Sequence, residues 1–97
     1  MIKGKQRAYL KSLAHNLDVM SHIGKEGITD SFLSSLEEVI EKREIVKVRI
    51  LDNCGIDAKE AANEVCEAIN AEFVQAIGST FTIYKKSKNN PVITLPK

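Results

Sequence analysis

The segment Glu44–Leu51 constrains the fold more than any other part of the chain. It is a β-branched run whose side chains alternate with the two-residue period of a strand. One face is apolar, and the other carries Lys47 and Arg49. This basic pair would extend a basic surface across a sheet, although the ordinary solubility of a strand explains it almost as well.

Helical periodicity flanks this strand on both sides. The segment Gln6–Leu17 carries apolar residues at steps of three and four, which predicts an amphipathic helix. Thr29 is the expected cap of a second helix with one apolar stripe. Asp57, followed three residues later by Glu60, resembles a capping box and predicts the start of a third helix.

Three further extended segments complete the pattern: Val19–Ile23, Phe73–Ile77 and Thr80–Lys85. Gly78 and Ser79 separate the last two and suit a two-residue hairpin turn, because glycine tolerates positive φ. The order is therefore αβαβαββ. Two strand–helix–strand units imply parallel crossovers and the hairpin adds an antiparallel strand, which predicts an α/β (α+β) fold with a mixed four-stranded sheet.

The length of 97 residues and the 43% hydrophobic content indicate one domain, residues 1–97, with 87–97 as a flexible or edge-strand tail. No stretch resembles a signal peptide or a membrane span, so we expect a cytoplasmic protein that binds no membrane. A monomer is expected, because no long apolar seam is visible.

Charge is distributed unevenly along the chain. All 13 acidic residues lie between Asp18 and Glu72, whereas residues 1–17 and 73–97 each carry four basic residues. If the two ends meet on one side of the fold, they create a basic face that attracts phosphate backbones. Alternatively, the terminal lysines only keep frayed ends soluble.

The loop Gly24-Lys25-Glu26-Gly27 separates the first predicted strand from the second helix. Two glycines let a sugar–phosphate chain approach the backbone, Lys25 supplies charge, and the following helix start favours an anion. As a bare pattern Gly-x-x-Gly is weak, because any tight strand-to-helix loop uses glycine for its backbone angles. Tyr84, beside Lys85 and Lys86, could stack on a base or pack as a half-buried strand aromatic.

No residues converge in the sequence as a catalytic or metal set. His15, His22, Cys54 and Cys66 have neither zinc-knuckle nor helical His-pair spacing, so we expect no metal and no cofactor. Cys66 falls beside an apolar stripe, and Cys54 lies in a predicted turn. No nucleophile, phosphate-binding loop or dinucleotide fingerprint is visible, and we expect no enzyme activity.

Several ordered blocks resemble the bacterial YhbY-like proteins, which are stand-alone CRM domains (chloroplast RNA splicing and ribosome maturation). The blocks are Lys5–His15, His22–Thr29, Glu44–Val48, Val74–Gly78, Ile83–Lys85 and the closing Ile93–Pro96. The resemblance implies an RNA-binding domain folded like the C-terminal domain of translation initiation factor three, with a Gly-x-x-Gly loop like that of KH domains. It also implies association with precursors of the large ribosomal subunit through ribosomal RNA.

The resemblance and the basic positions together give a predicted RNA-binding set. Glu26 departs from a position that is commonly glycine or basic in relatives, and its carboxylate should weaken binding to phosphate. Lys85 replaces a frequent arginine and loses its planar guanidinium. The set comprises Gly24, Lys25, Glu26, Gly27, Lys5, Arg7, Lys11, Lys47, Arg49, Gly78, Tyr84 and Lys85.

Two non-catalytic functions remain open at this point. The first is a ribosome-assembly factor that binds ribosomal RNA mainly through phosphate and sugar contacts. The second is a protein-interaction module whose acidic helices meet a basic partner such as a ribosomal protein. The acidic residues concerned are Glu37, Glu38, Glu41, Glu60, Glu64 and Glu67.

Overall fold

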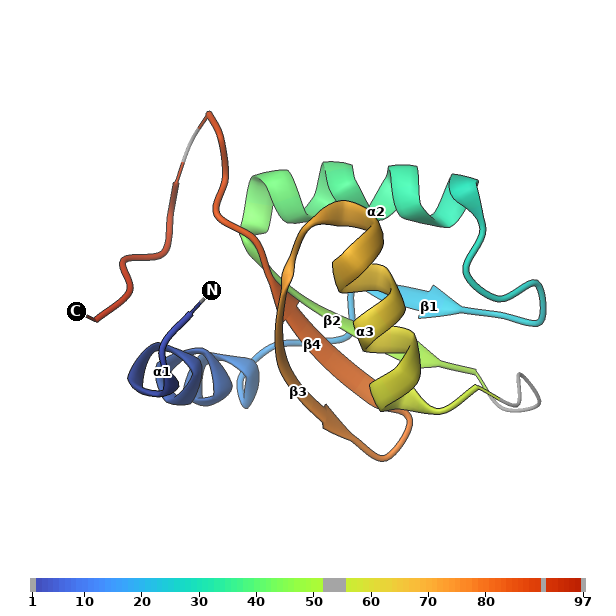
Figure 1. The fold of residues 1–97 in the computed structure, drawn as a ribbon, viewed down its shortest axis with the longest axis horizontal. Coiled ribbons are helices and arrows are strands. Elements are labelled where there is room, and N and C mark those ends of the chain that lie inside the picture. The colour runs from blue at the N-terminus through green and yellow to red at the C-terminus, as the bar shows by residue number, and fades with distance from the viewer. Residues whose placement is uncertain (1, 52–55, 90, 97) are drawn as a thin grey trace.

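The computed structural model describes residues 2–51, 56–89 and 91–96. It contains the predicted order of three helices and four strands (Figure 1). The expected turn at residues 52–55, with Cys54, lies outside the described residues. The elements are α1 (Gly4–Ala14), β1 (Ser21–Ile23), α2 (Asp30–Arg43), β2 (Ile45–Ile50), α3 (Ala58–Ile69), β3 (Glu72–Ile77) and β4 (Thr80–Tyr84).

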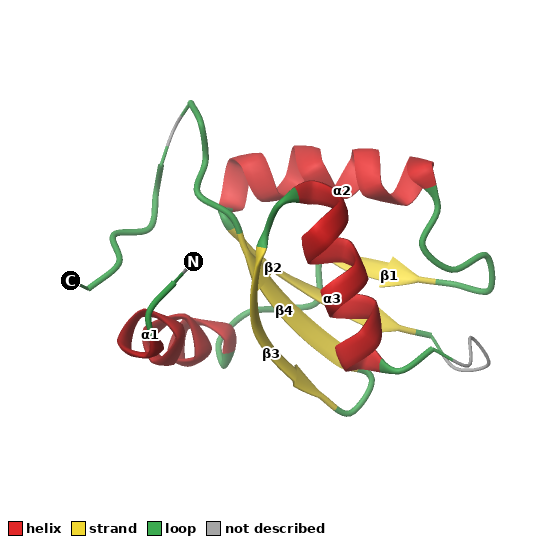
Figure 2. Cartoon of the chain, in the orientation of Figure 1, coloured by secondary structure: helices red, strands yellow, loops and turns green. Residues whose placement is uncertain are grey.

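The four strands form one mixed sheet in the order β1-β2-β4-β3, which confirms the predicted fold class (Figure 2). β1 pairs with β2 in parallel, and β4 is antiparallel to both of its neighbours. The hairpin from β3 to β4 turns at Gly78 and Ser79 as predicted, with Gly78 at a φ of 59°. The hairpin inserts β4 beside β2 and leaves β3 at the edge of the sheet.

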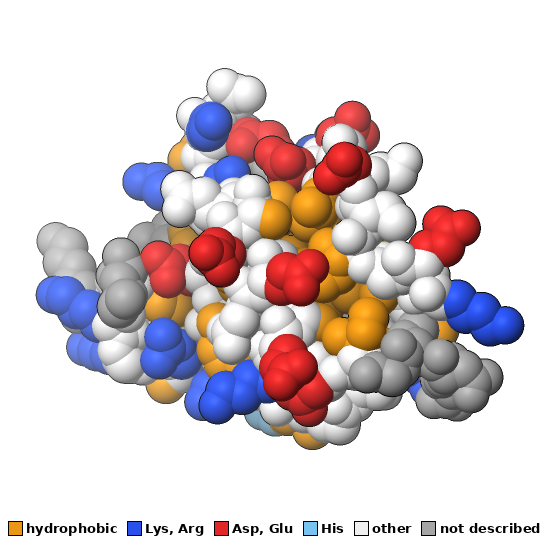
Figure 3. Space-filling view, turned by 45° about the vertical axis from the view of Figure 1, so that its right-hand side comes forward, with side chains coloured by type: hydrophobic (Ala, Val, Ile, Leu, Met, Phe, Trp, Pro, Cys, Tyr) orange, Lys and Arg blue, Asp and Glu red, His pale blue; other side chains and the backbone are white. Residues whose placement is uncertain are grey.

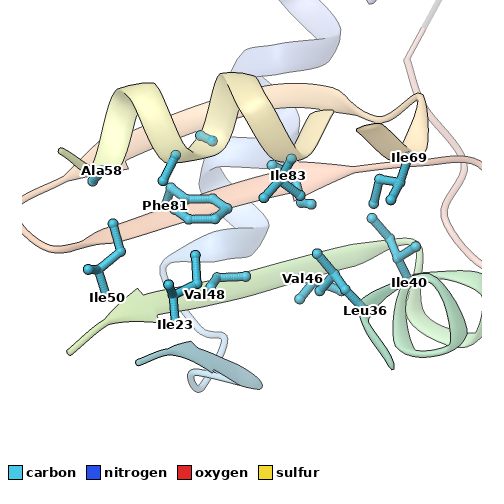
Figure 4. Packing of buried hydrophobic residues seen from close by; sticks show 13 residues of the cluster. Ile23, Leu36, Ile40, Val46, Val48, Ile50, Ala58, Ile69, Phe81 and Ile83 are labelled. Atoms are coloured by element: carbon cyan, nitrogen blue, oxygen red, sulfur yellow. The ribbon is translucent and has the colours of Figure 1, made fainter. Parts of the chain in front are cut away.

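The main core lies between one face of the sheet and the helices α2 and α3 (Figure 4). The predicted caps start both helices: the Thr29 side chain accepts a hydrogen bond from the Phe32 amide at 3.0 Å, and Asp57 accepts one from the Glu60 amide at 3.2 Å. Each cap contributes about 1 kcal/mol. Side chains that meet in this core include Leu36, Ile40, Val46, Val48, Val65, Ile69, Phe81 and Ile83.

Helix α1 packs on the opposite face of the sheet. Its Leu10 joins Ile45, Val74 and Tyr84 in a second buried cluster. The helix is three residues shorter at its C-terminal end than predicted, because after Ala14 the backbone continues in turns closed by bonds between residues three apart. At its start, the Lys3 amide donates to the Gln6 side chain at 2.9 Å.

The first strand is also shorter than predicted, spanning Ser21–Ile23 instead of Val19–Ile23. The Met20 amide still donates to the Lys47 carbonyl at 2.9 Å, and the Leu51 amide donates to the Ile23 carbonyl at 2.9 Å. Three residues are enough to place the following loop at the end of β1, next to the edge of the sheet.

The C-terminal tail is held by Glu44, a role that the sequence pattern around this residue did not predict. Glu44 follows α2 at a φ of 67°, and its side chain is fully buried. Its carboxylate accepts hydrogen bonds from the backbone amides of Ser87 at 2.8 Å, Ile93 at 2.6 Å and also Val92. The tail therefore packs against the domain through a buried anion.

Glu41, one turn earlier in α2, holds the first part of the tail. Its carboxylate accepts bonds from the Ser87 hydroxyl and from the amides of Lys88 at 3.0 Å and Asn89 at 3.2 Å. These donors, led by the Ser87 hydroxyl, lower the pKa of Glu41.

The prediction that the tail adds an edge strand at Val92–Leu95 is wrong, because these residues form no strand. The side chains of Ile93 and Leu95 pack against the second buried cluster, beside α1, instead.

The two ends of the chain lie on the same side of the molecule, next to α1 (Figure 1). The Gln6 side chain donates to the Pro96 carbonyl at 3.1 Å. Acidic side chains spread over the face of α2 and α3, whereas most basic side chains seen in Figure 3 lie toward α1 and the termini. No helix in the described part of the chain is long and apolar enough to span a bilayer.

Candidate functional site

The loop Gly24–Gly27 forms a tight turn between β1 and α2. The Gly27 amide donates to the Gly24 carbonyl at 3.0 Å, which closes the turn and leaves Lys25 and Glu26 exposed at its tip. The loop borders a shallow hollow of about 400 Å³ that also touches His22 and Phe32. A sugar–phosphate chain that lies in this hollow would contact both the backbone of the loop and the side chain of Lys25.

The two glycines of the loop have different structural roles. Gly27 has a φ of 73°, a conformation that side chains with a Cβ rarely adopt. Gly24 has no such requirement, and among the described residues a Cβ at this position would come within 4.0 Å of the Leu51 side chain, an ordinary van der Waals contact. The backbone conformation therefore requires glycine at position 27. At position 24 glycine is not required for folding, and the absence of a Cβ lets a ligand come closer to the backbone.

This difference predicts opposite results for two alanine variants. Gly27→Ala should lower the free energy of unfolding by about 1 kcal/mol through backbone strain. Gly24→Ala should change it by less than about 0.5 kcal/mol, because the added methyl group makes only ordinary van der Waals contact with Leu51. Urea unfolding of the two variants measures both values. An equal loss for both would contradict the assigned roles.

Three of the predicted basic residues hold backbone carbonyls inside the fold. The Lys85 ammonium donates to the Ile69 carbonyl at 2.8 Å, at the C-terminal end of α3. Arg7 donates to the Phe73 carbonyl at 3.3 Å. Lys47 donates at 3.4 Å to two carbonyls at the end of α1. Each side chain thus stabilises a junction between elements, whatever else it binds.

The other basic positions divide between two regions. Lys25 lies in the loop, and Arg49 is exposed on β2 and paired in register with His22 of β1, next to the loop. Lys5 and Lys11 are exposed on α1. The predicted set is therefore spread over the loop, the adjoining sheet and α1 rather than gathered in one pocket.

Two further predicted positions lie away from the loop. Tyr84 is only 4% exposed, because α1 covers its ring, and burial together with the nearby Glu44 raises its pKa. Of the two roles that the sequence left open for Tyr84, this burial fits a packed strand aromatic and not stacking on a base. Gly78 lies in the exposed hairpin turn, where its positive φ explains the glycine.

Among the described residues, Cys66 also has a shifted pKa. It packs against the main core, where burial, followed by the charge of Glu72, raises the pKa of its thiol to about 12. The thiol therefore stays protonated at neutral pH and is a poor nucleophile. Within residues 2–51, 56–89 and 91–96, no group of three or more His, Cys, Asp or Glu side chains could hold a metal ion.

Residues outside the predicted RNA-binding set also shape this side of the molecule. His22 borders the loop hollow, and a second hollow of about 220 Å³ lies on the sheet at the end of α1. Gln75 and Thr82, from β3 and β4, contribute to it beside Lys47. Only alternation along the strands could have predicted that these three side chains share a face.

Comparison with known proteins identifies the class to which this fold and loop belong. Residues 2–85 match the CRS1/YhbY (CRM) domain family, and the chain belongs to that family. The Bacillus subtilis protein named Probable RNA-binding protein YqeI is 38% identical over 96 residues, which cover 99% of this chain and 100% of that protein.

Two other proteins are similar over nearly the full length. A Haemophilus influenzae protein named RNA-binding protein is 29% identical over 93 residues, covering 96% of this chain and 93% of that protein. The solution structure of the hypothetical protein SAV1595 from Staphylococcus aureus, described as a candidate RNA-binding protein, is 46% identical with a TM-score of 0.83. That match covers 99% of this chain and 100% of the other.

Proposed function

We propose that this protein is a non-catalytic RNA-binding protein that holds the sugar–phosphate backbone at the loop Gly24–Gly27. The observation that carries the proposal is Gly24, a glycine that the backbone conformation does not require, next to an exposed lysine. The names of the similar proteins and the family itself support RNA as the ligand. Gly24→Ala should therefore weaken RNA binding several-fold without loss of stability.

The electrostatics around the loop favour backbone contacts over base recognition. Lys25 is exposed in the loop that leads into α2, and Arg49 is exposed on β2, where it pairs in register with His22 at the border of the loop hollow. Glu26 and Asp30 are also exposed and reduce the positive potential. Binding of this kind depends on a few phosphate contacts and falls as salt rises.

The finer proposal is a monomeric, cytoplasmic ribosome-assembly factor that associates with precursors of the large subunit through ribosomal RNA. It is supported by the resemblance to stand-alone CRM domains and by a basic side made of both chain ends. A particle that presents folded RNA supplies many phosphates at once, which compensates for the acidic residues near the loop.

Sedimentation of a tagged protein from a gentle-salt extract tests this finer proposal. We expect the protein to migrate with particles near the large subunit and to be released when salt is raised. Migration with free proteins at low salt would contradict the ribosomal role. A Lys25→Ala variant, run in parallel, should shift toward the free fraction.

The acidic face gives one alternative function, the binding of a basic protein. Glu37, Glu38, Glu60, Glu64 and Glu67 are exposed, and Figure 3 shows an apolar strip among acidic side chains on α2 and α3. Glu41 does not belong to this face, because its carboxylate binds the tail. Association that survives ribonuclease treatment would favour this alternative.

A further inference from the structure

The face of the sheet that α1 packs against is covered over only part of its length. Paired residues of neighbouring strands share a face, so the strand registers define rows across the sheet. The row containing Ile45 and Tyr84 is buried under α1. The next two rows continue past the end of that helix: Lys47, Thr82 and Gln75 form one, and His22, Arg49, Thr80 and Ile77 form the other.

A hollow of about 220 Å³ lies over these rows at the C-terminal end of α1. Ile77 gives it apolar surface and is 64% exposed, although it is a large aliphatic residue on a strand. Gln75 adds a partly exposed amide, and Thr82 of the adjacent strand is 1% exposed and lies beneath it. The hollow thus combines apolar contact with an amide that both donates and accepts hydrogen bonds.

Lys47 is fixed at the border of this hollow. Its ammonium donates to the carbonyls of Ala14 and Leu17, each at 3.4 Å, which uses two of its three N–H groups. The third N–H remains for a ligand. Because these two bonds already restrain the Lys47 side chain, it loses little further conformational entropy when a ligand binds.

This combination suits a nucleobase better than a bare anion. A phosphate needs donors only, whereas Gln75 also accepts. A base has apolar faces that can lie on Ile77 and an edge with donors and acceptors that an amide can pair. In a helix the faces of a base are covered by stacking and its pairing edge is occupied, so only an unpaired base can offer both to this hollow.

The hollow is connected to the loop by a continuous row of residues. His22 borders the loop hollow and pairs in register with Arg49, which pairs with Thr80 at the border of the sheet hollow. Strands lie about 4.8 Å apart, so the distance from β1 to β4 is on the order of 10 Å. A single RNA strand can span this distance within a few nucleotides.

We propose that the hollow at the end of α1 binds one unpaired base of an RNA strand whose backbone lies at the loop Gly24–Gly27. The inference rests on the proposed RNA-binding function and extends its site onto β2, β4 and β3. Gln75 reads the edge of the base, Ile77 contacts its face, and Arg49 holds the phosphate between the two hollows.

Fluorescence anisotropy with a short unstructured single-stranded RNA of mixed sequence, and with a duplex of the same length, tests the proposal. Gln75→Ala should weaken binding of the single strand about tenfold and leave duplex binding unchanged. The salt dependence should stay the same, because the amide contacts no phosphate. Asn63→Ala, which removes an exposed amide on α3, is the matched control and should bind like the unmodified protein.

The outcomes separate the two proposals. If the unmodified protein binds RNA with the expected salt dependence and Gln75→Ala binds as tightly, the base site is wrong and the loop proposal stands. If the unmodified protein binds neither RNA, both are wrong. Photocrosslinking of the unmodified protein to 4-thiouridine RNA gives an answer that does not depend on variant folding: crosslinks in residues 75–82 support the base site, and crosslinks confined to α2 and α3 overturn it.

Discussion

Glu44→Ala is expected to lower the free energy of unfolding by about 3 kcal/mol, because three tail amides lose a charged acceptor in a buried place. The donors are the amides of Ser87, Val92 and Ile93. Removal of a buried charge recovers some desolvation energy, but the amides left without this acceptor outweigh it. Urea unfolding at neutral pH measures the difference.

Two comparison variants separate the carboxylate from the backbone at this position. Glu44 has a φ of 67°, which strains any residue with a Cβ. Glu44→Gly should therefore be about 1 kcal/mol more stable than Glu44→Ala, although both lose the carboxylate. Glu38→Ala, on an exposed part of α2, should stay within about 0.5 kcal/mol of the unmodified protein. A comparably small loss for Glu44→Ala would mean that other contacts anchor the tail.

Lys25→Glu is expected to weaken RNA binding about 30-fold at low salt, because a phosphate contact is lost and replaced by repulsion. All RNA ligands should be affected to a similar degree, since the contact is to the backbone. The slope of log affinity against log salt should become shallower by about one contact. Anisotropy titrations at several salt concentrations measure both quantities.

Lys42→Glu is the matched control for this reversal. It makes the same change in net charge on an exposed lysine at the other end of α2. It should reduce affinity far less than Lys25→Glu, and equal losses would indicate a nonspecific effect of net charge.

Glu26→Gln provides the opposite test at the loop, because removal of the Glu26 carboxylate should raise the affinity for RNA several-fold. The same anisotropy titrations measure this change.

The parts of the fold that local sequence dictates were predictable. The caps at Thr29 and Asp57, the strand Ile45–Ile50 and the hairpin turn at Gly78 each depend on residues a few positions apart. The ends of α1 and β1 were misplaced by a few residues. After Ala14 the backbone passes into local turns, and before Ser21 a single backbone bond from Met20 to Lys47 extends the pairing, so neither boundary is set by one residue type in the sequence.

The features that depend on distant residues were not predictable. Glu44 binds amides that lie 43 to 49 positions later in the chain, and its acidic type gave no sign of this. Tyr84 is buried because α1 covers the end of β4, a packing choice that no local pattern records. The second hollow combines α1 with three strands, so its lining emerges only once the register is known.

The measurement that tests the central claim most directly is the affinity of the unmodified protein for single-stranded RNA as a function of salt. We predict binding that weakens steeply as salt rises, with a log–log slope that corresponds to a few phosphate contacts. Lys25→Glu should reduce that slope. Absence of binding at low salt, or an affinity that does not change with salt, would contradict the account.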